Sequence, residues 1–217
     1  MSRKLSLAMA LKSLVGALVL VGVTGIVASR VVSDDKTPPP GQQQPSKEEA
    51  EMQRKMMEAG TPGQHHKYLE PFVGEWDAES KFWMGPGEPM VAKATATTKW
   101  IMGGRFIEMD YHGDFQGMAF IGRATTGYDN TLKRFNSTWL DNMSTTMFYS
   151  TGTDADSGRT LTFTGEAPCC MTGEIKKHKS VWKSLSKDKH VFEMFEEGKD
   201  GKSTKQMEIT YTRRTAA

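Results

Sequence analysis

The sequence predicts an all-β protein: an antiparallel meander of about ten strands closed into a barrel, preceded by an N-terminal hydrophobic helix and a short amphipathic helix. From residue 74 onward, short runs of alternating apolar and polar residues are separated by glycine-rich turns, which is typical of consecutive hairpins. This part of the sequence contains no long segment of helical periodicity. A parallel βαβ architecture is therefore not expected.

The composition is that of an ordinary globular domain. The chain has 217 residues, and its 28 basic and 26 acidic residues leave a net charge of +2. This balance lacks the clustered basic charge of a nucleic-acid-binding protein, so we expect no nucleic-acid partner. The two cysteines, Cys169 and Cys170, are adjacent and cannot build a disulfide framework. The 15 methionines are better explained by a methionine-rich core than by an adaptable cavity.

Residues 1–30 are predicted to be a targeting segment. Basic residues precede a mostly apolar run, residues 13–29, which ends at Arg30. The run is short for a membrane-spanning helix and slightly long for the core of a cleaved signal peptide. Of these two interpretations we favour the transmembrane anchor. Both place the remainder on the extracytoplasmic side, periplasmic or secreted, because the basic residues stay inside. A lipoprotein anchor is excluded because no cysteine follows the run.

Residues 31–64 are predicted to be a linker rich in proline and glutamine that contains one short helix, residues 47–59. The prolines stiffen such a linker into an extended spacer. Ser46 and Glu49 form the capping-box pattern that begins a helix, and Gly60 is expected to end it. The apolar residues of this helix are sparse, so it should be solvated or loosely docked. A partner-binding helix is the less favoured alternative.

The barrel domain is predicted to span residues 65–217. A second short helix should lead into it, beginning at Thr61 with the following proline in its first turn. His66, Leu69 and Val73 then lie near one face. We expect this segment to plug one end of the barrel.

The strands are predicted from alternation and turns. They are Glu75–Trp83, Val91–Ile101, Arg105–Asp114, Gly117–Tyr128, Lys133–Asp141, Thr146–Asp154, Thr160–Ala167, Lys176–Leu185, His190–Glu196 and Lys205–Arg213. In the last of these, Met207, Ile209 and Tyr211 share one face. A sandwich would also bury one face, but a meander closes easily into a barrel and so loses its exposed edges. About ten strands leave more room than eight, so we expect an internal cavity.

An ordered set of motifs carries a family likeness. It consists of His66-x-x-Leu69, Gly74-x-Trp76, Gly103-Gly104-Arg105, Gly127-Tyr128-Asp129, Trp139-x-Asp141, Gly158, Gly165-Glu166 and Tyr211-x-Arg213. The set resembles a bacterial family of domains of unknown function, number 1579, over residues 65–214. The resemblance implies a calycin-like barrel, similar in architecture to lipocalins, fatty-acid-binding proteins and haem-binding nitrobindins. It implies no activity.

Trp76 is also predicted to have a structural role at the closure of the barrel. It begins the first strand, and an arginine late in the last strand should lie beside it when the barrel closes. Arg213 or Arg214 would then place a guanidinium within about 6 Å of the indole, a cation–π contact worth about 0.5–2 kcal/mol.

Cofactor sites are not expected. A haem site needs an axial histidine aimed into an apolar cavity. His190 is the best candidate because it shares a strand face with Phe192 and Met194, and His178 and His112 are weaker ones. A lone histidine on a strand is more often structural. A metal site needs three or four ligands, and the pair at residues 65–66 has no matching second cluster.

The sequence contains no trusted catalytic signature. It lacks the G-x-S-x-G motif of many hydrolases. The acidic residues near predicted strand ends and turns are Asp129, Asp141, Asp154 and Glu166. Acids in such places usually cap turns through side-chain hydrogen bonds. In an alternative interpretation, Glu108, Asp110 and Asp141 are polar groups of a pocket.

The leading hypothesis is a non-enzymatic barrel that binds a small apolar or amphipathic molecule, with membrane contact only through the N-terminal segment. The predicted cavity residues are Trp100, Met109, Tyr111, Phe120, Trp139, Phe163, Trp182, Phe192 and Met194. Arg105 could bind a carboxylate on the ligand, although an ion-paired or solvated strand end is favoured. One alternative is a hydrolase or isomerase that uses a pocket carboxylate. Another is an interaction module with a filled barrel.

Overall fold

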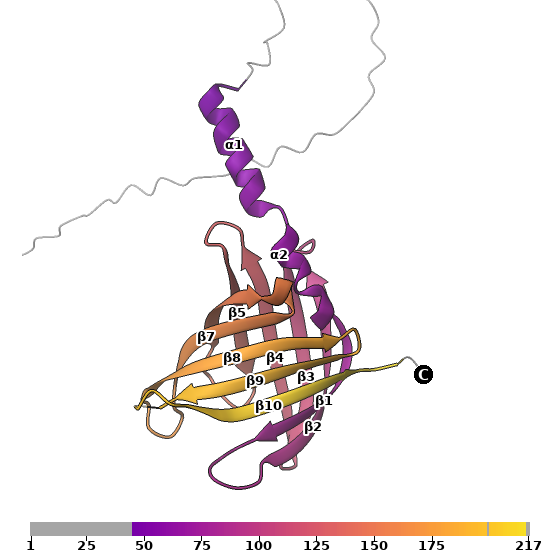
Figure 1. The fold of residues 1–217 in the computed structure, drawn as a ribbon, viewed down its shortest axis with the longest axis vertical. Coiled ribbons are helices and arrows are strands. Elements are labelled where there is room, and N and C mark those ends of the chain that lie inside the picture. Colours follow the sequence, from indigo (N-terminus) through magenta and orange to yellow (C-terminus); the bar gives the residue numbers. More distant parts are fainter. Residues whose placement is uncertain (1–44, 199, 216–217) are drawn as a thin grey trace, which may run out of the picture. The chain divides into compact units, whose positions relative to one another are not determined.

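The structure, a computed structural model, shows a closed barrel of ten antiparallel strands (Figure 1). It describes residues 45–198 and 200–215. The strands are β1 Gly74–Phe82, β2 Met90–Ile101, β3 Phe106–Phe115, β4 Met118–Asp129, β5 Arg134–Asp141, β6 Phe148–Ala155, β7 Thr160–Pro168, β8 Ile175–Ser186, β9 Lys189–Glu197 and β10 Ser203–Arg213. Each strand pairs with its neighbours along the chain, and β1 pairs with β10. The predicted all-β meander barrel is therefore confirmed.

The predicted strand ends differ from the observed ends by at most two residues. Two of the differences are explained by a turn residue with positive φ. Gly117 has φ +83° and Lys133 has φ +52°, so both belong to turns and the strands begin one residue later. A left-handed residue cannot continue a strand.

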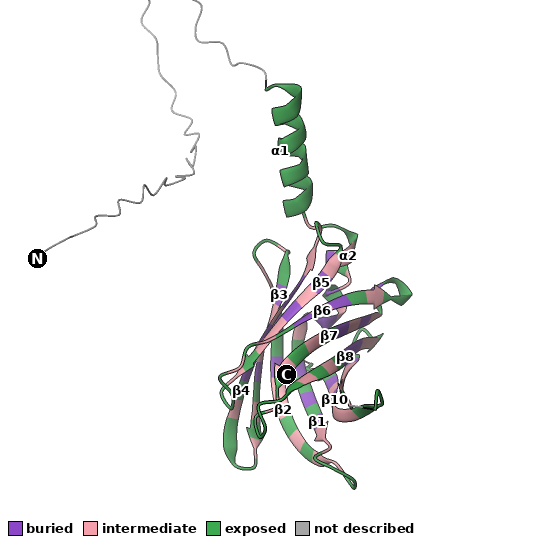
Figure 2. Ribbon diagram, turned by 90° about the vertical axis from the view of Figure 1, so that its left-hand side faces the viewer, coloured by how far each residue is buried: buried purple, intermediate pink, exposed green. Residues whose placement is uncertain are grey.

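The first helix, α1, runs from Lys47 to Gly60. Its capping box is present: the Glu49 amide donates to Ser46 Oγ (3.2 Å), and the Ser46 amide donates to Glu49 Oε2 (2.8 Å). No side chain of α1 is buried, and Figure 2 shows the helix exposed along its whole length. The prediction of a solvated helix is confirmed.

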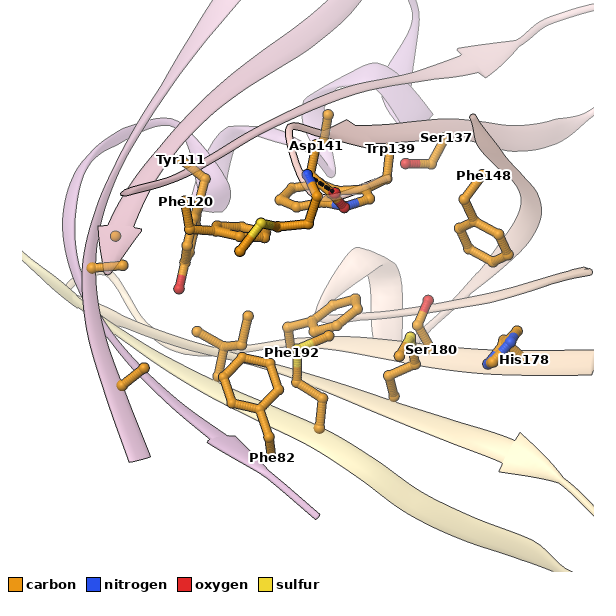
Figure 3. Close-up of a pocket in the computed structure, with 18 of the residues that line it drawn as sticks. Phe82, Tyr111, Phe120, Ser137, Trp139, Asp141, Phe148, His178, Ser180 and Phe192 are labelled. Carbon is orange, nitrogen blue, oxygen red and sulfur yellow. Dashed lines mark hydrogen bonds between the residues drawn. The ribbon is translucent and has the colours of Figure 1, made fainter. Parts of the chain in front are cut away.

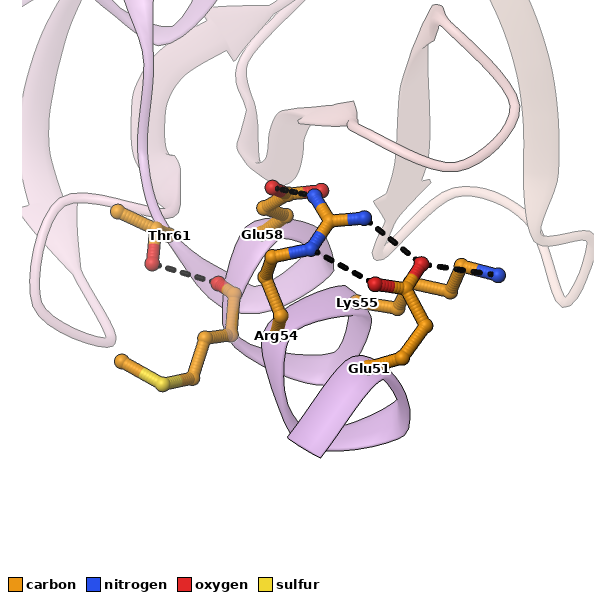
Figure 4. Close-up of polar contacts among 6 residues, drawn as sticks. Glu51, Arg54, Lys55, Glu58 and Thr61 are labelled. Atoms are coloured by element: carbon orange, nitrogen blue, oxygen red, sulfur yellow. Dashed lines mark hydrogen bonds and ion pairs between the residues drawn. The ribbon is translucent and has the colours of Figure 1, made fainter. Parts of the chain in front are cut away.

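An arginine bridge stabilises α1 on its exposed surface. Arg54 binds Glu51 (2.7 Å) and also Glu58, as Figure 4 shows. Exposed pairs of this kind contribute little to stability, because solvent and salt screen them. At its C-terminus, α1 meets the β4–β5 turn, where Asn130 Nδ2 donates to the carbonyls of Glu58 (3.1 Å), Ala59 (3.2 Å) and Thr61 (2.7 Å).

None of the helices within residues 45–198 and 200–215 has the length and apolar character needed to cross a membrane. The predicted targeting segment, residues 1–30 with its apolar run at 13–29, lies outside the described residues.

The second helix, α2, spans Gln64–Lys67, and a 3-10 helix, η1, follows at Glu70–Phe72. The predicted helix start at Thr61 is wrong. The helix begins after Gly63, whose amide donates to His66 Nδ1 (3.0 Å), so the proline at position 62 lies ahead of the cap.

Residues 64–72, which we call the plug, close one end of the barrel as predicted. Leu69 and Phe72 are fully buried, and His66 is almost so. They pack against inward-facing barrel residues that include Phe135, Leu161 and Trp182. Val73 is only partly buried.

The barrel closes through a contact between Trp76 and Arg213. These residues are opposite each other in the β1–β10 pair, and Arg213 Cζ lies 4.1 Å from the centroid of the indole. Arg213 also donates from Nη1 to the Val73 carbonyl (3.1 Å). The indole Nε1 donates to the Phe72 carbonyl (3.0 Å). The predicted contact thus forms with Arg213, while Arg214 instead pairs with an exposed acid, residue 77 (3.5 Å).

Gly74 makes room for this arginine. It has φ +137°, and a Cβ added there would lie 2.1 Å from Arg213 Nη1. We expect Gly74→Ala to lower the free energy of unfolding by about 1–3 kcal/mol, because it adds backbone strain and displaces the guanidinium. Urea denaturation measures this effect. Gly60→Ala is the matched control, since nothing lies within 4 Å of its added Cβ. Equal losses in the two variants would contradict the explanation.

Candidate functional site

A cavity of about 500 Å³ lies inside the barrel. All ten strands contribute side chains to its wall, and Figure 3 shows part of this lining. Phe82 and Phe115 line it near the ends of β1 and β3, and Met143 lines it from the β5–β6 turn. These three positions are at the end of the barrel opposite the plug. The cavity therefore extends from the interior to the unplugged end.

Small inward-facing residues create the space. They are Ala92, Ala94, Gly113, Ala124, Ser137, Ser150 and Ser180. A glycine also lets a large ring lie flat against the wall: a Cβ at Gly122 would lie 2.3 Å from the Trp139 ring. The aromatic rings thus line the cavity without filling it, and the ten-stranded barrel keeps a lumen.

Several polar groups at the cavity wall already have a partner in the protein. Tyr111 Oη and Ser80 Oγ are hydrogen-bonded (2.8 Å), and Ser137 Oγ is hydrogen-bonded to a buried threonine (2.8 Å). Burial raises the pKa of Tyr111, and it raises the pKa of Tyr211 well above its ordinary value. The inner wall is therefore a strongly desolvated environment.

His178 differs from these groups. Its imidazole lines the cavity from β8 (Figure 3), and its Nδ1 is buried with no hydrogen-bond partner among the described residues. Burial lowers its pKa, and Lys176 adds to the effect while Glu196 opposes it. A lowered pKa favours the neutral imidazole. The next inward residue on the strand is Ser180, which is also buried.

The structure brings together seven of the ten predicted cavity residues. They are Tyr111, Phe120, Trp139, Phe163, Trp182, Phe192 and Met194. Strand alternation identified them because it determines which side chains face inward.

Trp100, Met109 and Arg105 do not line the cavity. Trp100 Nε1 donates to a plug carboxylate, residue 70 (2.7 Å). Met109 faces inward but is enclosed in the core cluster around Trp76. Arg105 is exposed and donates to the carbonyl of residue 102 (3.1 Å). All three lie toward the plugged end, and alternation gives the side of a residue but not its depth along the barrel axis.

Two acids of the alternative pocket interpretation lie on the outer face. Asp110 pairs with Arg123 (2.7 Å), and Glu108 pairs with Lys99 (3.6 Å). That part of the interpretation is wrong. Asp141 does line the cavity, but its Oδ2 accepts from Trp139 Nε1 (2.9 Å) and its Oδ1 accepts from a backbone amide (2.9 Å).

Asp129 caps a turn as predicted. Its Oδ1 accepts from the amides of residues 131 (2.8 Å) and 132 (2.9 Å). The backbone hydrogen bond from Leu132 is the main reason that its pKa is lowered. Asp154 instead pairs with His65 Nδ1 (3.3 Å). Among the residues that the structure describes, no group of three or more His, Cys, Asp and Glu side chains is placed to hold a metal ion.

His190 is not placed for haem ligation. It stacks on Tyr211 (centroids 4.2 Å apart) and meets Trp76 (4.4 Å) and Phe72 (5.2 Å) edge-on. Burial, with a smaller effect of Arg213, lowers its pKa to about 3. Its Nε2 is buried without a partner among the described residues, and the side chain does not line the cavity. His190 therefore does not suit the role of an axial haem ligand. Its ring packs in the core instead.

Sequence reasoning missed several lining residues, among them Phe82, Phe115 and Phe148. The signal was present for Phe148, because it faces Trp139 across the β5–β6 pair. Exact pairing register was needed to use that signal.

The fold and the cavity define the class: a closed, ten-stranded antiparallel barrel with one plugged end and a mostly apolar interior. The family model "Protein of unknown function (DUF1579)" matches residues 61–213, and the chain belongs to this family. No curated protein matches the sequence at a significant level.

Two solved structures share the barrel fold. The crystal structure of Rv2717c from M. tuberculosis is 9% identical, with a TM-score of 0.53, and the match covers 71% of this chain and 100% of that chain. The S-type phycobiliprotein lyase CPES from Guillardia theta is 11% identical, with a TM-score of 0.50, and the match covers 75% of this chain and 98% of that chain. At these identities the likeness is one of fold.

Proposed function

We propose that this protein is an extracytoplasmic barrel that binds a small apolar or amphipathic molecule. The cavity of about 500 Å³ carries the proposal. Its volume lies within the range of about 300–1,000 Å³ that is usual for ligand pockets, and a mostly apolar wall with few polar groups is the usual lining. The fold shared with a phycobiliprotein lyase is compatible with a small-molecule site inside the barrel.

The two alternative functions have less support. A filled barrel would leave no lumen, whereas small wall residues keep one open here. An enzyme with a pocket carboxylate would use Asp141, the acid of the predicted set that lines the cavity. Both oxygens of that carboxylate already accept hydrogen bonds, so it is built to hold Trp139 and the adjoining turn.

The extracytoplasmic location and the anchor at residues 13–29 are part of the proposal. The basic residues ahead of the apolar run, and the proline-rich linker behind it, support them. A short stiff spacer would hold the barrel away from the membrane surface.

Native mass spectrometry of the full chain, purified from its own host, tests the proposal. We expect a co-purifying small molecule at one per chain. Ala92→Phe should lower the bound fraction, because Ala92 lines the cavity and a phenyl ring there occupies part of the lumen near its open end. Thr97→Phe is the matched control, since Thr97 is exposed on the same strand. It should keep the bound molecule.

Two outcomes would contradict the proposal. One is wild-type protein that carries no small molecule and also fails to enhance the fluorescence of Nile red, a neutral dye that emits in apolar surroundings. The other is a ligand retained equally in both variants, which would place the site outside the lumen.

A further inference from the structure

Three side chains on β6 and β8 place polar groups on the mostly apolar cavity wall. They are Ser150 on β6, and His178 and Ser180 on β8. Gly165 on β7 pairs with both Ser150 and His178. The Phe148 ring packs over this glycine and meets the His178 imidazole edge-on, with the ring centroids 5.9 Å apart. We call Ser150, His178 and Ser180 the polar wall.

The polar wall has unused hydrogen-bonding capacity. Within the described residues, neither serine hydroxyl makes a side-chain hydrogen bond, in contrast to Ser137 elsewhere in the lining. His178 Nδ1 is buried and unpartnered. A buried N–H without an acceptor is rarer and more costly than an unused lone pair. The proton of the neutral ring therefore belongs on Nε2, the nitrogen that can reach the cavity.

The rest of the lining disfavours a buried anion. The basic residues among those that line the cavity are His178 and Lys93, and Lys93 is exposed. Lys176, one inward position beyond His178, is already paired with Glu174 (3.3 Å) and Glu196 (3.5 Å). Two acids, residues 114 and 141, also line the cavity. A carboxylate inside would have no free counter-ion, and burial of an unpaired charge is very costly.

We propose that the ligand is a neutral, largely apolar molecule with one hydrogen-bonding oxygen, and that this oxygen binds at the polar wall and accepts a hydrogen bond from His178 Nε2. Ser180, the next inward residue on β8, is placed to add a second contact. This inference rests on the proposed function, since it names the chemical class of ligand for the same cavity.

Displacement of Nile red from the full-length protein at pH 8 tests the ligand class. The competitors are 1-octanol, 1-chlorooctane and octanoate, which have chains of the same length. We expect octanol to bind about tenfold or more tightly than octanoate, because only octanoate must bury a charge. Equal or tighter binding of octanoate would overturn the proposal.

Variants test the role of the wall. The ratio of the chlorooctane Kd to the octanol Kd should fall roughly threefold to tenfold in His178→Phe, the effect of one net hydrogen bond. Ser180→Ala should also lower this ratio. Because it is the smaller substitution, it provides the test if the His178 variant does not fold. His112→Phe is the matched control, because His112 is exposed on β3, and should leave the ratio unchanged.

The outcomes separate this inference from the proposed function. If the wild type binds neither Nile red nor any competitor, the proposed function fails. If the wild type binds them but the ratio is the same in His178→Phe, Ser180→Ala and wild type, only the polar-wall assignment fails.

Discussion

Replacing Trp76 by alanine should lower the free energy of unfolding by about 3–5 kcal/mol, the largest effect expected of a single substitution in this barrel. Trp76 is 0% exposed and is the largest fully buried side chain. Its removal would leave a cavity and would also remove the ring beneath Arg213 and the donor to the Phe72 carbonyl. A cation–π contact alone contributes about 0.5–2 kcal/mol. The indole thus joins the plug, β1 and β10.

Urea denaturation followed by far-ultraviolet circular dichroism measures this loss without depending on tryptophan fluorescence. Trp83→Ala is the matched control, because Trp83 is the same residue type, follows β1 at the unplugged end and is only partly buried. Trp76→Phe should give an intermediate loss. If Trp76→Ala and Trp83→Ala had equal midpoints, the closing contact would not have the importance that its burial implies.

Acid should destabilise the fold through His190. Its pKa is lowered from 6.5 to about 3 in the folded protein, whereas the unfolded chain protonates it near 6.5. Above pH 6.5 the His190 ring is neutral in both the folded and the unfolded state, so it does not change the free energy of unfolding. As the pH falls from 6.5 toward 3, the unfolded state gains a proton that the folded state does not accept, so stability decreases. The expected loss from this group is about 3 kcal/mol between pH 7.5 and pH 4.

Chemical denaturation at a series of pH values measures this slope, and His190→Phe isolates the contribution of the group. The variant should lose about 3 kcal/mol less than the wild type over the same range. The comparison is needed because burial also lowers the pKa values of His66 and His178, which act in the same direction. His112→Phe should keep the wild-type slope. If the free energy of unfolding changed with pH equally in His190→Phe and wild type, the core would not be keeping the imidazole neutral.

The barrel could be predicted because its evidence is local. Alternation and turn residues specify each hairpin, and a meander needs nothing else to determine its strand order. The helix start at Gln64 was missed because Gly63 is capped by His66 Nδ1, a contact that no pattern of prolines reveals. The sequence around a helix start that is capped by a histidine looks the same as the sequence of an ordinary loop.

The candidate site was predictable in part, for a related reason. Alternation placed Phe192 and Met194 correctly at the cavity but also favoured His190, which shares their face. His190 belongs to the core, whereas Phe192, two residues further along the strand, lines the cavity. The depth of the plug determines where the core ends and the cavity begins. The importance of His178 depends on an orphaned nitrogen, which is a property of burial in three dimensions.

The pairing of β1 with β10 has a consequence for how the chain folds. Nine of the ten strand pairs join neighbours along the chain, and only this pair brings distant segments together, at Trp76 and Arg213. Local hairpins form with little loss of loop entropy, whereas the last pair must close nearly the whole domain. We therefore expect β1 and β10 to pair last. Until they pair, each of these two strands has an unpaired edge that another chain could extend.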